Sequence, residues 1–170
     1  MTQKKLRQLA KLADQEPAFT KVSLKNLANE RLIRNQLQAE FNKHFRAKEG
    51  VQGLVDRIMK VTNASRERAI TIAQTERTRA LNGSRLARDL EQYFKDYDKA
   101  VKGHRKRPEV PEYMWVNPLR AKEPRHEHVA ISGTRRQAGE EFLPGLRYPG
   151  DPQAPPSQTI RCHCYIRRTN

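Results

Sequence analysis

The sequence predicts an α+β fold, in which long N-terminal α-helices forming a helical hairpin precede a small C-terminal module of short strands and loops. Up to about residue 100, apolar residues recur at the spacing of amphipathic helices. Beyond that point, short alternating segments are separated by proline and glycine. The apolar fraction of 36% and the mean hydropathy of −0.94 indicate a modest core and much solvated helix surface.

The helical part divides into an N-terminal helical arm, residues 1–50, and a helical hairpin, residues 51–100. In the arm, a short amphipathic segment breaks near Pro17, and a helix is predicted from about Ser23 to Ala47, ended by Gly50. In the hairpin, a short helix stops at a turn rich in capping residues, 62–65, and a long helix follows. A DNA-binding helix-turn-helix has the same outline, but so does any helical hairpin.

A basic linker, residues 101–112, follows the hairpin. Its densest charge lies at Lys102, Arg105, Lys106 and Arg107. The whole chain carries a net charge of +15, so its field attracts polyanions such as DNA, RNA or an acidic protein surface. We therefore predict that these four residues contact nucleic acid, with a solvated linker as the alternative. No long apolar run is present, and no membrane partner is expected.

The C-terminal module, residues 113–170, is predicted to contain short strands and long loops. An aromatic strand spans 113–116, with Trp115 as a core residue. A short helix or strand is expected at 128–131, and a turn-rich segment runs from Pro144 to Pro156. Residues 159–166 then alternate as a strand that puts both cysteines on one face.

A metal site is one interpretation of His128, Cys162 and Cys164, because thiolate and imidazole are zinc ligands. Common zinc modules use Cys-x2-Cys or longer spacing, so two sulfurs of Cys-x-Cys reach one ion only if the strand twists or bulges. The fourth ligand would be His126, His163, a carboxylate or water. The alternative is a pair of buried cysteines beside a histidine bonded to the backbone. A disulfide between residues so close would be strained, and a reducing cytoplasm fits the pair best.

Catalysis is less well supported, and we predict that the chain is not an enzyme. A small nuclease or toxin-like enzyme using His128 and Arg125 remains an alternative, because a histidine base beside a phosphate-binding arginine can cleave a phosphodiester. Cys162 as a nucleophile would need a base and an orienting group. Glu76 is interpreted as the partner of Arg79 on one helix face, since it lacks a second carboxylate at helical spacing.

Five short motifs follow one another in the order and spacing of a known family. They are Ile-Ala-Gln-Thr-Glu-Arg-Thr-Arg-Ala-Leu-Asn at 72–82, Trp115, Arg-His-Glu-His-Val-Ala-Ile-Ser-Gly at 125–133, Phe142 with Pro-Gly-Asp-Pro at 149–152, and Ile-Arg-Cys-His-Cys at 160–164. They resemble the phage Mu F-like family, the minor head or head-morphogenesis proteins of tailed bacteriophages. The motif residues are Thr75, Glu76, Trp115, Arg125, His128, Gly133, Phe142, Cys162 and Cys164. The chain departs from the family pattern at Ser132, Arg161 and His163, where members usually have Asp, Asn and Arg.

This resemblance implies a virion protein, present in few copies inside the head near the portal. It would aid head assembly, contact the portal protein and other head proteins, and touch the packaged DNA, after a period in the host cytoplasm during assembly. The family's histidine and Cys-x-Cys pair, carried onto His128, Cys162 and Cys164, also imply a structural polar cluster or a metal, most simply zinc. A basic DNA-binding accessory protein without a head role is a further alternative.

Overall fold

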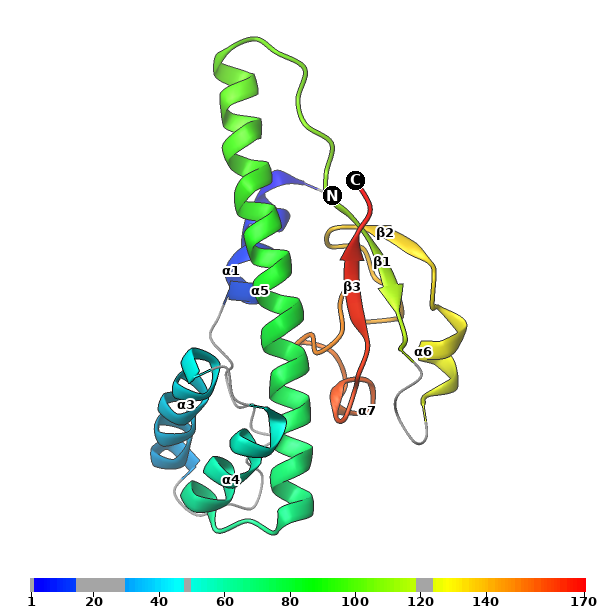
Figure 1. The fold of residues 1–170 in the computed structure, drawn as a ribbon. Helices are drawn as coiled ribbons and strands as arrows, with labels where there is room; N and C mark the ends of the chain where they lie inside the picture. The colour runs from blue at the N-terminus through cyan, green and yellow to red at the C-terminus, as the bar shows by residue number, and fades with distance from the viewer. Residues whose placement is uncertain (1, 15–29, 48–49, 119–123) are drawn as a thin grey trace.

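The computed structural model describes residues 2–14, 30–47, 50–118 and 124–170, and its mixed architecture confirms the α+β prediction (Figure 1). The N-terminal elements are the helices α1 (Gln3–Asp14), α3 (Glu30–Ala47), α4 (Val51–Thr62) and α5 (Arg66–Lys102). The C-terminal elements are β1 (Glu112–Val116), α6 (His126–Ala130), β2 (Arg135–Gln137), α7 (Pro156–Thr159) and β3 (Tyr165–Arg168). None of the helices in these ranges is long and apolar enough to cross a bilayer.

The predicted turn between α4 and α5 is confirmed, and its capping residues explain it. Asn63 ends α4 in the left-handed conformation with φ 52°, and the Ser65 hydroxyl accepts a hydrogen bond from the Arg68 amide at the start of α5. Gly50, expected to end the preceding helix, occupies the N-cap position of α4. The expected break near Pro17 and the helix start near Ser23 lie outside the described residues.

The core divides into two clusters of buried side chains along α5. One joins α3 and α4 to the first turns of α5, through Leu37, Phe41, Leu54, Val55, Ile58, Ala69, Ile72 and Ala73. The other joins α1, the second half of α5 and the C-terminal module, with Trp115 at its centre. Gly83 lets α1 cross α5 closely, because a Cβ atom there would lie 2.7 Å from the Ala13 carbonyl oxygen. The long helix α5 is therefore the element shared by both clusters.

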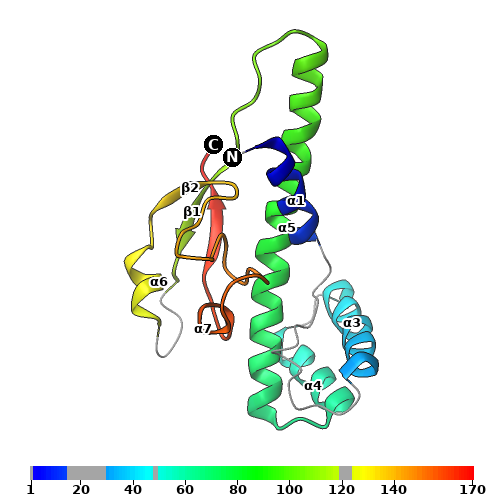
Figure 2. The same ribbon diagram turned by 180° about the vertical axis from the view of Figure 1, so that it is seen from behind.

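The three strands form an antiparallel sheet in the order β2-β1-β3. Its inner face carries Tyr113, Trp115 and Ile166, which are buried. The segment between β2 and α7 covers that face; it lies behind the sheet in Figure 1 and in front of it in Figure 2. The free edge of β3 runs beside α5. The opposite, outer face of the sheet is turned toward the viewer in Figure 1.

The strand predicted over residues 159–166 is wrong in its position. Thr159 ends α7, and β3 begins only at Tyr165. Arg161 between them has a φ of 54°, in the left-handed region that no extended strand uses. The predicted alternation is nevertheless present, because Cys162, Cys164 and Ile166 are buried while Arg161 and His163 are exposed. Residues 126–130 are a helix, and the three-residue strand β2 was not predicted.

Candidate metal centre

The side chains of His128, Cys162 and Cys164 meet in the interior of the C-terminal module. His128 Nδ1 lies 3.6 Å from the sulfur of Cys162 and 3.6 Å from that of Cys164. One ligand atom from each residue falls within 4.8 Å of the other two, and all three side chains are buried. Both cysteines are reduced. The structure thus brings together the three residues that the sequence singled out as metal ligands.

These separations fit a tetrahedral zinc ion. With Zn–S bonds of about 2.3 Å and Zn–N bonds of about 2.0–2.1 Å, tetrahedral angles place nitrogen and sulfur about 3.6 Å apart. Both nitrogen–sulfur distances here are 3.6 Å. A cavity of about 20 Å³ borders the three side chains, also lined by Arg125 and His163. This volume admits a single ion or water but no organic substrate.

A hydrogen-bonded chain fixes the tautomer of His128. Its Nε2 lies 2.8 Å from Gln158 Oε1, and Gln158 Nε2 donates to Glu127 Oε2 at 2.6 Å. Because the amide nitrogen of Gln158 donates to Glu127, its oxygen faces His128 and accepts the proton of Nε2. Nδ1 is then left with a lone pair directed at the two sulfurs, which is the state that binds a metal. The Trp115 ring meets the His128 ring edge-on at 5.1 Å.

The two thiols perturb one another. The hydrogen bond from Cys164 lowers the pKa of the Cys162 thiol below its ordinary value. The same interaction and burial raise the pKa of the Cys164 thiol above its ordinary value. Two adjacent buried thiolates repel, so without a cation only one of the two ionises readily. A bound divalent ion removes that restriction, because it neutralises both.

A stripe of polar side chains on α5 holds the backbone that carries both cysteines. We call Thr71, Thr75, Thr78, Asn82 and Arg85 the α5 polar stripe. Thr75 Oγ1 accepts from the Arg161 amide at 3.1 Å, and Thr78 Oγ1 donates to the Cys162 carbonyl at 2.6 Å. Asn82 Nδ2 donates to the Cys164 carbonyl at 3.3 Å, and its Oδ1 accepts from the Ile166 amide at 3.0 Å. Arg85 donates to the Ile166 carbonyl, and Thr71 accepts from the Arg161 guanidinium.

The Glu76–Arg79 pair anchors a second loop to α5. The predicted pairing is confirmed, with Arg79 Nη1 at 2.9 Å from Glu76 Oε2 and both side chains buried. Arg79 Nε also donates to the Gly150 carbonyl at 3.1 Å. Gly150 has a φ of 82°, and a Cβ atom there would lie 2.7 Å from Arg79 Cα. Glycine is therefore required at this contact, for both its conformation and its lack of a side chain.

The remaining motif residues have structural contacts. Arg125 donates from its guanidinium to the carbonyls of Ser157 and Ile160, which ties α6 to the α7 segment. Phe142 packs on Trp115 with ring centroids 5.3 Å apart. Gly133 has a φ of 89° in the turn before β2. The Ser132 hydroxyl accepts a hydrogen bond from the Asn117 amide at 3.1 Å.

Other predicted residues lie away from this centre. Lys102, Arg105, Lys106 and Arg107 are exposed, at the end of α5 opposite to α6 and α7 (Figure 1). His126 and His163, considered as the fourth ligand, are both exposed, although His163 borders the small cavity. Within the described ranges the metal-ligand group therefore has three members.

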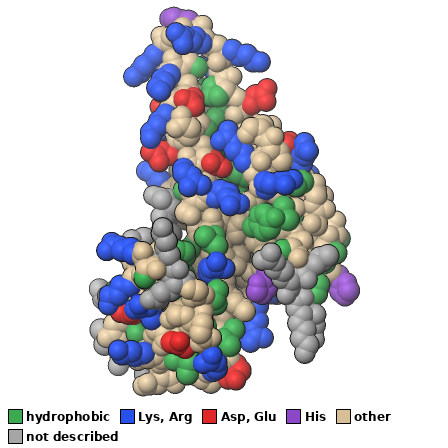
Figure 3. Space-filling view, viewed as in Figure 1, with side chains coloured by type: hydrophobic (Ala, Val, Ile, Leu, Met, Phe, Trp, Pro, Cys, Tyr) green, Lys and Arg blue, Asp and Glu red, His purple; other side chains and the backbone are tan. Residues whose placement is uncertain are grey.

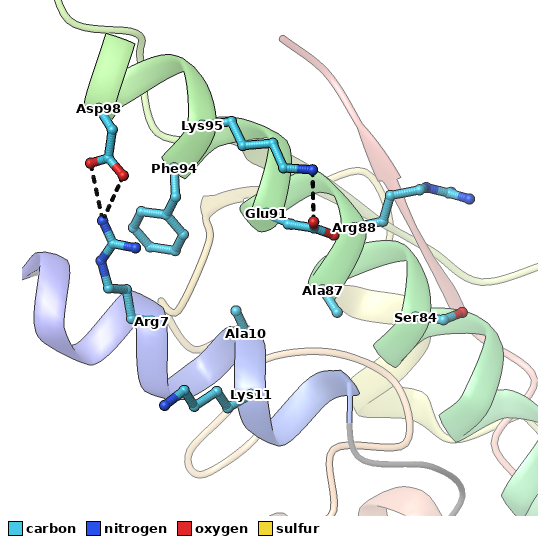
Figure 4. Close-up of a pocket in the computed structure, with 10 residues that line it drawn as sticks. All are labelled: Arg7, Ala10, Lys11, Ser84, Ala87, Arg88, Glu91, Phe94, Lys95 and Asp98. Carbon is cyan, nitrogen blue, oxygen red and sulfur yellow. Dashed lines mark hydrogen bonds and ion pairs between the residues drawn. The ribbon is translucent and has the colours of Figure 1, made fainter. Parts of the chain in front are cut away.

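A groove of about 430 Å³ lies between α1 and α5, and its lining does not include the cysteines (Figure 4). Ala10, Ala87 and Phe94 give it apolar walls. Arg7 crosses one end, 4.2 Å over the Phe94 ring and 3.2 Å from Asp98. The groove is thus the seam of two packed helices, and its acidic side chains are paired with basic ones.

Comparisons of the chain with models of protein families, with curated proteins and with solved structures found no match. The resemblance to Mu F-like proteins therefore rests on the sequence motifs alone.

Sequence reasoning missed Gln158 and most of the α5 polar stripe. The spacing of the stripe, at residues 71, 75, 78, 82 and 85, is that of one helix face, and this signal could have found it. Gln158 has no comparable signal, because a lone glutamine in a proline-rich segment is ordinary loop composition.

Asn82→Ala should destabilise the protein, because it leaves the Cys164 carbonyl and the Ile166 amide without these partners. The expected loss is about 2–4 kcal/mol in the free energy of unfolding, measured by urea denaturation. Ser84→Ala, on the exposed side of the same helix, is the matched control and should change stability by less than about 0.5 kcal/mol. Equal stability of the two variants would show that the stripe does not hold the cysteine segment.

Proposed function

We propose that this chain is a minor head protein of a tailed bacteriophage or prophage. It is present in few copies inside the head near the portal, where it aids head assembly and contacts DNA. The observation that carries the proposal is the convergence of the Mu F-like motifs. Motif residues from Thr75 to Cys164 are linked by hydrogen bonds and ring contacts within one folded module, as motifs that belong together would be.

Each motif supports another in that cluster. Thr75 and Asn82 of the first motif bond the backbone of the Cys-x-Cys segment. Trp115 packs against both His128 and Phe142. Arg79 holds the Pro-Gly-Asp-Pro loop through Gly150. These contacts support the proposal that the five motifs belong to one module.

The same geometry favours a structural role over the nuclease alternative. His128 is only 2% exposed, and its two ring nitrogens face Gln158 and the cysteines. Arg125 is engaged by two backbone carbonyls. The bordering cavity of about 20 Å³ has no room for a phosphodiester. We assign the DNA contact instead to exposed basic residues whose long, positively charged side chains can reach phosphates: Lys102, Arg105, Lys106 and Arg107.

We further propose that His128, Cys162 and Cys164 bind zinc as a structural ion. The ligand types, the 3.6 Å nitrogen–sulfur distances and the fixed tautomer of His128 support this. A structural ion would also stabilise the module, since metal binding adds directly to folding stability.

Head incorporation tests the main proposal. The full chain, co-produced with the portal, scaffold and coat proteins encoded beside it, should sediment with head particles in few copies per particle. Particles assembled without the portal are the control and should contain markedly less of it. A chain that stays in the soluble fractions in both cases would contradict the head role and favour a DNA-binding accessory protein. Cleavage of DNA or RNA that His128→Ala stops would favour the nuclease.

Elemental analysis tests the zinc. The purified full chain should contain close to one zinc per molecule, and Cys162→Ser combined with Cys164→Ser should abolish binding. His104→Ala, an exposed histidine near the end of α5, should leave it unchanged. At free zinc a hundredfold above the dissociation constant, the ion should add about 2.7 kcal/mol to stability, so a chelator should lower the melting temperature. Folded wild-type protein that stays metal-free in added zinc would contradict the proposal.

A further inference from the structure

The outer face of the sheet carries an apolar centre between arginines. We call Met114, Val116, Arg135, Tyr165 and Arg167 the sheet patch. The register pairs Met114 with Arg135 on one side and Arg167 on the other, and it pairs Val116 with Tyr165. Directly paired residues project from the same face of a sheet, so these five side chains share one surface. Tyr165 is 39% exposed, and both arginines are exposed.

This arrangement departs from the usual pattern of an antiparallel sheet that has one solvent-exposed face. Such a sheet alternates apolar residues inward with polar residues outward. Strand β1 is apolar on both sides, because Tyr113 and Trp115 are buried inward while Met114 and Val116 point outward. Figure 3 shows the result as a hydrophobic patch over the sheet beside a group of Lys and Arg side chains. A strand that is apolar on both faces is typical of a sheet that is covered on both faces.

We propose that the sheet patch is the docking surface for an acidic protein partner, whose apolar contact residues are flanked by carboxylates. The composition matches the core of a protein–protein interface, where tyrosine, methionine and arginine are enriched and lysine is depleted. The partner's carboxylates would pair with Arg135 and Arg167. The identity of the partner as a neighbouring head protein rests on the proposed function.

Charge and chemistry exclude two other occupants. A second copy of this chain, placed face to face on the same patch, would set arginines against arginines at the rim. A DNA backbone would place phosphates against Met114, Val116 and Tyr165. Of these side chains, only the tyrosine hydroxyl can donate a hydrogen bond to compensate for the desolvation of the phosphates. Arg85 adds positive charge beside β3, where it donates to the Ile166 carbonyl. Among the residues that the register of the described strands places on this face, the acidic one is Glu112, which is paired with Gln137 and lies 3.8 Å from Arg135.

The test places the photo-cross-linking residue p-benzoylphenylalanine at position 165 of the full chain, co-produced with its portal, scaffold and coat proteins. Irradiated head particles should give one cross-link, to an acidic head protein. Arg135→Glu combined with Arg167→Glu should reduce its yield roughly fivefold or more, as expected for the loss of two ion pairs and their replacement by repulsion. Lys4→Glu combined with Lys5→Glu makes the same change in net charge on exposed residues of α1 and should leave the yield unchanged.

The outcomes separate this inference from the proposed function. If the wild-type chain enters head particles but position 165 cross-links to DNA, to a second copy or to nothing, the docking surface is wrong and the head role stands. An unchanged yield in the Arg135 and Arg167 variant would also overturn it, provided that circular dichroism shows the variant folded. If the wild-type chain never enters the particles, both proposals fail together. A cross-linker at Val101, which is 46% exposed on α5 outside the patch, should not capture the same partner.

Discussion

The hydrogen bonds between the α5 polar stripe and the backbone of residues 161–166 are the constraint on which the C-terminal module depends. An edge strand leaves a row of amide and carbonyl groups without partners, and burying them beside a helix is costly unless they are bonded. The backbone of α5 cannot help, because its own groups are used within the helix. The side chains of Thr75, Thr78 and Asn82 supply the missing hydrogen bonds to these backbone groups. Helix α5 therefore takes the place of a fourth strand.

This arrangement explains how a Cys-x-Cys pair can direct both sulfurs to one point. The Arg161 amide is held by Thr75 while its own φ is 54°, so the chain turns before it extends into β3. Cys162 and Cys164 then follow on the same side of the chain, and their carbonyls are held by Thr78 and Asn82. A longer Cys-x2-Cys loop is not required, because contacts with α5, rather than a backbone wrapped around the ion, fix the positions of the two sulfurs. The side chains of all three candidate ligands, His128, Cys162 and Cys164, are buried at this point.

Much of the helical architecture could be predicted from the sequence, because its signals are local. The turn at 62–65 uses capping residues, and the Glu76–Arg79 pair follows from helical spacing alone. The cluster of His128 with the two cysteines could be suspected from residue type and was found in place. The strand position could not be predicted, because the left-handed Arg161 is imposed by Thr71 and Thr75 across the fold. The alternation of apolar and polar residues over 159–166 depends on the local sequence alone, so it cannot indicate such a tertiary contact.

Amide hydrogen exchange, resolved by residue with NMR, tests the central constraint most directly. Ile166 points its amide away from β1 to Asn82, and the Arg161 amide points to Thr75. If the α5 polar stripe holds this segment, both amides should exchange at least about a hundredfold more slowly than exposed loop amides, and at rates close to those of the buried turns of α5. Exchange of both amides at the rate of exposed loops, with α5 still protected, would contradict the account.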